Sequence, residues 1–158
     1  MLQSWNSLSR WPGGGWLFSR RLGLLVPYSG SIRARVRELR PGHARLTLRD
    51  RHAIRQHLGS IHAVALVNLG ELTSGLAMLS ALPAGVRAIV TQLTAEYFKK
   101  ARGLLTAEAT VAAPVVSGPI DLEVSAAIKD AGGDPVCRVT ARWRLDTEGP
   151  RGRGAEGL

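Results

Sequence analysis

One carboxylate, Glu71, lies inside the most apolar stretch of the sequence, residues 61–82. An ionised carboxylate among apolar side chains costs free energy unless it is paired, hydrogen-bonded or protonated, and desolvation raises its pKa. A carboxylate with a raised pKa can accept a proton near neutral pH. Glu71 is therefore the candidate catalytic residue. The alternative is a purely structural role in which it bonds to a neighbouring side chain.

The start of the same stretch offers a second chemical feature. The first residues of a helix carry free backbone N–H groups and a positive dipole end, which can stabilise a developing oxyanion. Ala63 lies at this start and Glu71 follows eight residues later, which corresponds to about 12 Å along a helix. That distance is too long for one substrate. Two antiparallel helices from two subunits would bring Glu71 of one close to Ala63 of the other, so we expect a homodimer or a dimer of dimers.

The length of residues 61–82 would also suffice to span a membrane. His62, Asn68 and Glu71 would then lie in or near the hydrocarbon, where an ionised group costs roughly 2–4 kcal/mol. A buried core helix has the same all-round apolar character. We therefore expect a core helix that ends before Pro83.

Period-two alternation predicts strands on both sides of this helix. Two strands precede it, at 32–37 and 44–49, joined by a turn at Pro41–Gly42. Four strands follow, at 86–95, 105–111, 120–128 and 137–145, with a hairpin turn at 132–134. An antiparallel sheet of about five to six strands wrapped around one central helix buries both apolar surfaces, which is an α+β fold. The open sheet edges favour oligomerisation.

The length of the chain suits one domain, which we place at residues 1–146. A helical arm is expected over about 1–26, and a Gly- and Arg-rich tail at 147–158 is expected to be disordered. The first 37 residues contain six arginines and no acidic residue, as in a transit peptide. An arm that docks on the domain is the favoured interpretation, and an arm that touches a membrane surface is a further alternative.

The formal net charge is +9, which attracts anions such as nucleic acid, acidic lipid headgroups or phosphorylated small molecules. Nucleic acid is disfavoured because only 5% of residues are aromatic and no nucleic-acid-binding motif is present. A group after the third predicted strand could bind the phosphates of a ligand or form a solvated rim: Tyr97, Lys99, Lys100 and Arg102.

The single cysteine, Cys137, excludes an intramolecular disulfide, which favours a reducing compartment, the cytoplasm. We interpret it as a buried apolar residue. His52, His57 and His62 recur every five residues, a spacing that does not place them on one helical face, and no cysteine or aspartate completes a ligand set. Neither a metal nor a cofactor is therefore expected.

Two motifs carry a resemblance to a known family. The first runs from Gln56-His57-Leu58-Gly59-Ser60-Ile61-His62-Ala63 to Glu71-Leu72-Thr73-Ser74-Gly75. It resembles the signature of hotdog-fold acyl-CoA thioesterases of the phenylacetate-degradation (PaaI-like) type. The second pairs Pro27-Tyr28-Ser29-Gly30 with a His-Ala-x-Ala-Leu-x-Asn-Leu-x-Glu helix, and it resembles an uncharacterised-domain branch of that superfamily. The resemblance covers roughly residues 10–146.

The resemblance implies hydrolysis of an acyl-CoA. Glu71 would act as general base or nucleophile, and the Ala63 N–H would polarise the thioester carbonyl. Gln56 stands where relatives carry an asparagine, and Thr91 lies near a position that relatives place across the site. We expect further substrate-binding residues, with a buried dimer contact as the alternative role of the last: His57, Gly59, Ser60, His62 and Asn68.

The sequence departs from this signature at two places. Gln56 is longer than asparagine, and Ala63-Val64 replaces a Gly-Gly pair that allows close approach of substrate. These departures favour, as an alternative function, a hotdog protein that binds an acyl-CoA or a fatty acyl group without turning it over. A basic module that binds polyanions or a membrane surface is the third hypothesis.

Overall fold

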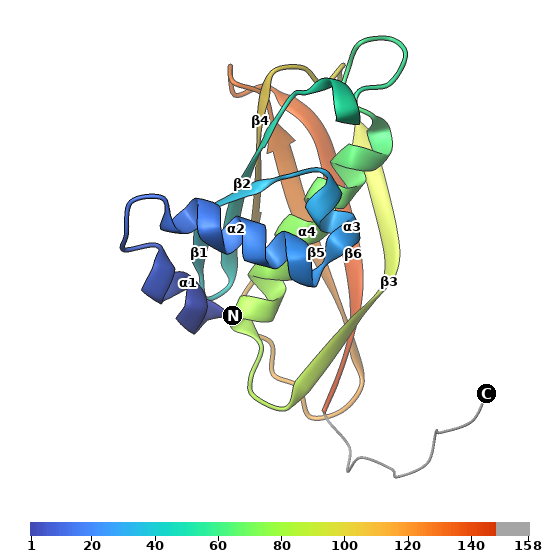
Figure 1. Cartoon of the computed structure of the whole chain (residues 1–158). Helices are drawn as coiled ribbons and strands as arrows, with labels where there is room; N and C mark the ends of the chain where they lie inside the picture. The colour runs from blue at the N-terminus through green and yellow to red at the C-terminus, as the bar shows by residue number, and fades with distance from the viewer. Residues whose placement is uncertain (148–158) are drawn as a thin grey trace, which may run out of the picture.

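The computed structural model describes residues 1–147, which form one sheet, one long helix and a helical N-terminal arm (Figure 1). Most of the predicted tail therefore lies outside the described residues. The elements, in chain order, are α1 (Leu2–Leu8), α2 (Gly14–Leu25), α3 (Pro27–Ser31), β1 (Arg35–Arg40), β2 (His43–Arg49), a short 3-10 helix (His52–Ile54), α4 (Ala63–Ala81), β3 (Val86–Tyr97), β4 (Leu104–Thr110), β5 (Ile120–Lys129) and β6 (Pro135–Thr147).

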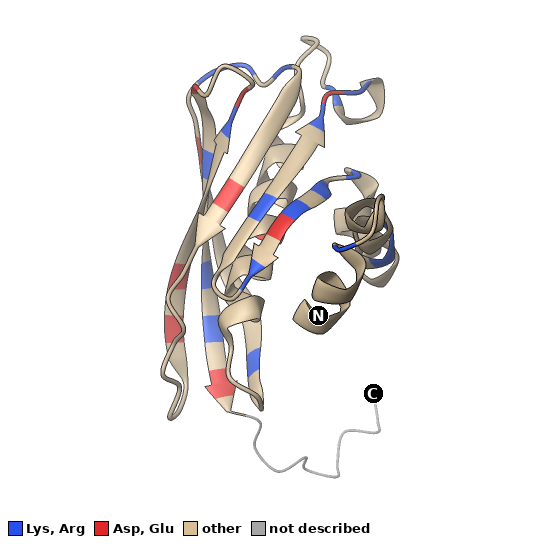
Figure 2. Cartoon of the chain, turned by 90° about the vertical axis from the view of Figure 1, so that its left-hand side faces the viewer, with Lys and Arg blue, Asp and Glu red and all other residues tan. Residues whose placement is uncertain are grey.

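The six strands form one antiparallel sheet in the order β1-β2-β4-β5-β6-β3. The predicted α+β fold with a sheet around one central helix, the hotdog fold, is confirmed. Figure 2 shows the sheet on one side of the molecule and the N-terminal helices on the other. β3 and β1 are the two edge strands, so each has one side without a partner strand among residues 1–147.

The central helix α4 lies very close to the sheet. A Cβ atom built on Gly70 would lie 2.3 Å from Cβ of Val139, and one built on Gly75 would lie 3.2 Å from the ring of Trp143. Both partners belong to β6, so glycine lets α4 approach this strand. Leu69, Ala77 and Met78 complete the buried side of the helix.

α4 is long and apolar enough to cross a membrane, but 67% of its most apolar window is buried inside the protein. This burial is typical of a core helix, because the sheet covers the apolar side chains that a membrane span would present to lipid.

The first strand differs from the prediction. Residues 27–31 are helical and Arg33 has a positive φ of 54°, so β1 begins at Arg35 and the predicted start at residue 32 was wrong. The pairing of β1 with β2 also shifts register between Val36 and Glu38. Because this bulge inserts one residue, Val36 and Leu39 are both buried although they are three positions apart.

Candidate functional site

The first turn of α4 has a donor group that the chain itself does not use. His62 is the N-cap, and its Nδ1 accepts a hydrogen bond from the Val64 N–H at 3.1 Å. The neutral ring therefore carries its proton on Nε2. Ala63 follows as the first helical residue, and within residues 1–147 its N–H donates no hydrogen bond. The positive end of the helix dipole lies at the same place, so this N–H could bind an oxyanion.

The loop before the helix is held by its own hydrogen bonds. The Gln56 side chain donates from Nε2 to Ser60 Oγ at 2.7 Å, and its Oε1 accepts from the Leu58 N–H. Gly59 has a φ of 72°, a conformation that favours glycine. Ser60 is buried, whereas His57 and Gly59 are exposed. Gln56, the predicted substrate or water ligand, is thus used in this structure to shape the loop.

A pocket of about 220 Å³ opens beside the first turns of α4. It lies between α4, α3 and the 3-10 helix, and two predicted site residues, His62 and Asn68, meet in it. An apolar cavity of about 150 Å³ holds a benzene molecule, so this pocket has room for a small acyl group. Its lining comprises Tyr28, Ser31, Ile32, Ala53, Ile54, Arg55, His62, Val64, Ala65 and Asn68.

Asn68 is a polar residue in the lining of this pocket. Its Nδ2 donates to the Tyr28 carbonyl oxygen at 3.2 Å. Its Oδ1 is buried and has no hydrogen-bond partner within residues 1–147. A buried acceptor without a partner costs about 1–3 kcal/mol of stability.

Glu71 lies eight residues after Ala63, about two turns further along α4, and does not line the pocket. It is half-buried, and burial raises the pKa of its carboxyl group. Within the described part of the chain, its side chain forms no hydrogen bond or ion pair. Helical spacing puts Glu71 on the same face as Val64 and Val67, which are also incompletely buried. One chain therefore does not bring Glu71 and Ala63 together.

Strand β3 carries two further residues, the predicted site residue Thr91 and Tyr97, and only Tyr97 contacts the first turn of α4. Thr91 lies at a register shift between Val90 and Gln92, is exposed, and donates from Oγ1 to the Arg142 carbonyl oxygen at 3.2 Å. The Tyr97 hydroxyl donates to the Ala63 carbonyl oxygen at 3.3 Å. Burial, with a smaller effect of Cys137, raises the pKa of Tyr97.

Sequence reasoning missed the contact between Tyr97 and the first turn of α4. The prediction had ended the strand at Ala95 and grouped Tyr97 with the cations that follow. Continuing the alternation by two residues would have placed Tyr97 on the helix side of the sheet. Lys99, another member of that group, forms ion pairs with Asp130 and Asp134, the latter at 2.7 Å, so its charge is already compensated.

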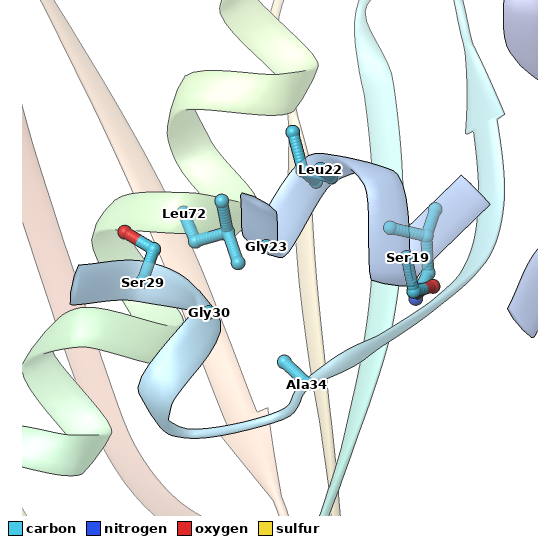
Figure 3. Close-up of a pocket in the computed structure, with 8 residues that line it drawn as sticks. Ser19, Leu22, Gly23, Ser29, Gly30, Ala34 and Leu72 are labelled. Atoms are coloured by element: carbon cyan, nitrogen blue, oxygen red, sulfur yellow. Dashed lines mark hydrogen bonds between the residues drawn. The ribbon is translucent and has the colours of Figure 1, made fainter. Parts of the chain in front are cut away.

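A second cavity, between α2, α3, β1 and α4, is too small for a ligand (Figure 3). Its volume is about 10 Å³, room for a single water molecule at most. Gly23 of α2 and Gly30 of α3 meet here, because a Cβ on Gly30 would lie 2.4 Å from the Gly23 carbonyl oxygen. This cavity therefore reflects the close packing of the arm and is not a substrate site.

Within residues 1–147, no three His, Cys, Asp or Glu side chains cluster as the ligands of a metal ion would. Burial raises the pKa of the Cys137 thiol to about 11, which leaves it protonated and weakly nucleophilic at neutral pH. Among residues 1–147, Glu71 is the carboxylate whose pKa burial raises, which makes it the candidate for a general base.

Comparison with known proteins gives a family and a set of structures. Residues 14–145 match the model of a domain of unknown function, DUF4442. The crystal structure of a structural-genomics protein, APC5556, is 30% identical, with a TM-score of 0.80 over 92% of this chain and 97% of that one. The search of curated proteins found no similar sequence.

Two more distant structures share the fold. The Pseudomonas aeruginosa protein PA5026, named a protein of unknown function and probable thioesterase, is 24% identical, with a TM-score of 0.70 over 82% of this chain and 91% of that one. A hypothetical thioesterase of Streptococcus pneumoniae TIGR4, solved with coenzyme A, is 20% identical, with a TM-score of 0.64 over 79% of this chain and 97% of that one. At these identities the similarity is one of fold.

Proposed function

Because the chain belongs to the DUF4442 family and has the hotdog fold of structures named as thioesterases, we propose that it hydrolyses the thioester of an acyl-CoA. The observation that carries this proposal is Glu71, a half-buried carboxylate with a raised pKa on the central helix. The S. pneumoniae structure with coenzyme A supports the choice of ligand. We also propose a cytoplasmic location, because a single cysteine, Cys137, fits a reducing compartment.

In the proposed reaction, Glu71 takes a proton from a water molecule while the water oxygen attacks the thioester carbonyl. The N–H of Ala63 of the partner subunit donates to the oxyanion that forms. The C–S bond then breaks, and the departing thiolate receives the proton from Glu71. Alternatively, the Glu71 carboxylate attacks the carbonyl directly and expels the thiolate, and water hydrolyses the resulting anhydride.

The proposed site needs two subunits, and the free edge of β3 is suited to bind the second one. Leu93 and Tyr97 lie on the side of the sheet that faces α4, because they pair with Ala141 and Cys137, which are buried. They are nevertheless 41% and 49% exposed. A second subunit at this edge would cover them and pair the free backbone groups of the strand.

The residues of β3 define one register for this pairing. If β3 pairs antiparallel with its own copy over its full length, Val86 lies opposite Tyr97 of the partner subunit. Arg87 then lies opposite Glu96 of the partner subunit, which brings opposite charges together. The register shift after Val90 changes which residues face α4. Because of this shift, helix-side residues meet helix-side residues across the proposed two-fold axis.

Release of free thiol from acyl-CoAs with short, medium, long and aromatic acyl groups tests the proposal. Glu71→Gln removes the base, and we expect loss of turnover with the fold retained. Glu123→Gln is the matched control, because this carboxylate lies exposed on β5 and bonds to Arg142. If the wild-type protein hydrolyses none of these thioesters, or if Glu71→Gln hydrolyses them as fast as wild type, the proposal fails.

The oxyanion donor has a separate test, Ala63→Pro. Proline lacks the N–H but is well tolerated at the first position of a helix. It also requires an extended residue before it, and His62 has φ −64° and ψ 140°. The variant should therefore fold, keep the Val64-to-His62 cap, and lose about 10²–10³-fold in kcat. An unchanged kcat would remove Ala63 from the mechanism.

A second candidate function is binding of an acyl-CoA without turnover. It is favoured by Gln56, whose amide nitrogen and oxygen each form a hydrogen bond within the loop, and by Val64, whose side chain is half-exposed at the helix start. Saturable thermal stabilisation by acyl-CoA, equal in wild type and Glu71→Gln and without thiol release, would identify the protein as a binder.

A further inference from the structure

The helix α2 presents an outward face that is both apolar and basic. Its members recur at one-turn intervals along the helix, as three adjacent pairs. We call this surface the α2 outer face: Trp16 and Leu17, Arg20 and Arg21, Leu24 and Leu25. The four apolar side chains are 50%, 38%, 75% and 80% exposed, in chain order. Monomeric soluble proteins rarely expose large apolar side chains in such a contiguous group.

The opposite side of α2 fixes this orientation. Phe18 is buried and its ring meets that of Trp5 edge-to-face, with centroids 5.2 Å apart. Ser19 Oγ accepts a hydrogen bond from the Val36 N–H at 2.9 Å, which ties α2 to β1. The close contact of Gly23 with Gly30 (Figure 3) ties its last turn to α3. The helix cannot roll its exposed apolar residues inward without breaking these contacts.

The charged side chains of the N-terminal region around α2 are all positive. Residues 1–37 include no aspartate or glutamate, and in Figure 2 the N-terminal helices carry blue segments and no red ones. The Arg20 guanidinium lies over the Trp16 ring, 5.3 Å from its centroid. Trp11, just before α2, is 73% exposed and extends the patch. The patch therefore combines large apolar side chains with arginines that form no ion pair within residues 1–147.

This combination determines the partner. A second copy of the chain packed face-to-face about a two-fold axis would bring Arg20 and Arg21 close to the same arginines, and like charges would repel. An anionic lipid bilayer has an apolar layer for tryptophan and leucine just below a negatively charged surface. Arginine can place its stem among apolar groups while its guanidinium stays at the phosphates. We propose that the α2 outer face binds the protein to the surface of anionic membranes.

Co-sedimentation of the full chain with vesicles tests this proposal. We expect binding to phosphatidylcholine vesicles that contain phosphatidylserine, weakening as salt increases, and little binding to phosphatidylcholine alone. Arg20→Gln/Arg21→Gln should weaken partitioning about 30-fold, from about fivefold for each arginine. Leu24→Ser/Leu25→Ser should also reduce binding, including at high salt. Because these side chains are exposed, the variants should keep the wild-type melting temperature.

The matched control is Arg40→Gln/Arg49→Gln, which removes the same charge from exposed positions on β1 and β2. Binding unchanged in this control supports the α2 outer face as the site. A control that loses as much affinity as Arg20→Gln/Arg21→Gln would reduce the effect to net charge and overturn the proposal. So would absence of vesicle binding by wild type. A Leu24→Ser/Leu25→Ser variant with altered oligomeric state but unchanged vesicle binding would assign the face to a second copy.

Discussion

Substitution of Gly70 by alanine tests how α4 lies on the sheet. The new Cβ would lie 2.3, 2.5 and 2.9 Å from the three side-chain carbons of Val139, whereas carbon atoms pack best about 3.5–4.0 Å apart. Val139 cannot withdraw easily, because β6 is held between β5 and β3. Overpacking of this kind costs about 1–3 kcal/mol, and the better helix propensity of alanine recovers up to about 1 kcal/mol. We expect a net loss of about 2 kcal/mol in the free energy of unfolding.

In a domain of this size, that loss corresponds to a fall in Tm of about 4–8 °C. Denaturant unfolding followed by circular dichroism measures it directly. Gly132→Ala is the control, because a Cβ there would meet only the Asp130 carboxylate oxygen, at 3.4 Å. The double variant Gly70→Ala/Val139→Gly should lose less stability than the sum of the single changes, since the clash is gone. If Gly70→Ala is as stable as wild type, α4 does not approach β6 at this residue.

Three other outcomes follow from the structure. Glu71→Gln should have the Tm of wild type near pH 4, which is about the pKa of an unfolded glutamate, and a higher Tm as the pH rises. The reason is that the raised pKa of Glu71 makes its ionisation destabilise the native state. A difference in Tm that does not depend on pH would refute this. Arg87→Glu should raise the Kd of the proposed dimer about tenfold, from two repulsive pairs, and Arg87→Glu/Glu96→Arg should restore it in sedimentation experiments. Arg138→Gln serves as the control, since Arg138 also bonds to Glu96. Gly59→Ala should lower the free energy of unfolding by about 1 kcal/mol through backbone strain alone, because no atom outside the adjoining residues lies within 4 Å of the new Cβ. An unchanged Tm in this variant would contradict the strain argument.

Local patterns in the sequence were enough to predict most of the fold. The apolar run with a glutamate inside it corresponds to α4, and the alternating segments after it correspond to β3 to β6. The alternation at 32–37 was misleading, because a positive φ at Arg33 and a bulge after Val36 change the backbone without changing the pattern of residue types. A bulge depends on how two strands pair, which one strand's sequence does not specify.

The candidate site was only partly predictable, for a similar reason. The raised pKa expected for Glu71 follows from its apolar neighbours along the helix, and burial does raise it. The bond from Asn68 to the Tyr28 carbonyl joins residues 40 positions apart, and no local pattern encodes it. The roles of the site residues remain predictions, because they depend on groups that a second subunit would bring.

The chain's single cysteine has a practical consequence. Cys137 is 1% exposed and its thiol has a pKa of about 11, so disulfide reagents that titrate sulfhydryls should not react with the native protein. Any sulfhydryl detected while the protein stays folded must then come from coenzyme A. An assay that detects free thiol therefore needs no correction for the protein's own cysteine. A slow rise in thiol signal without substrate would show that the protein is unfolding.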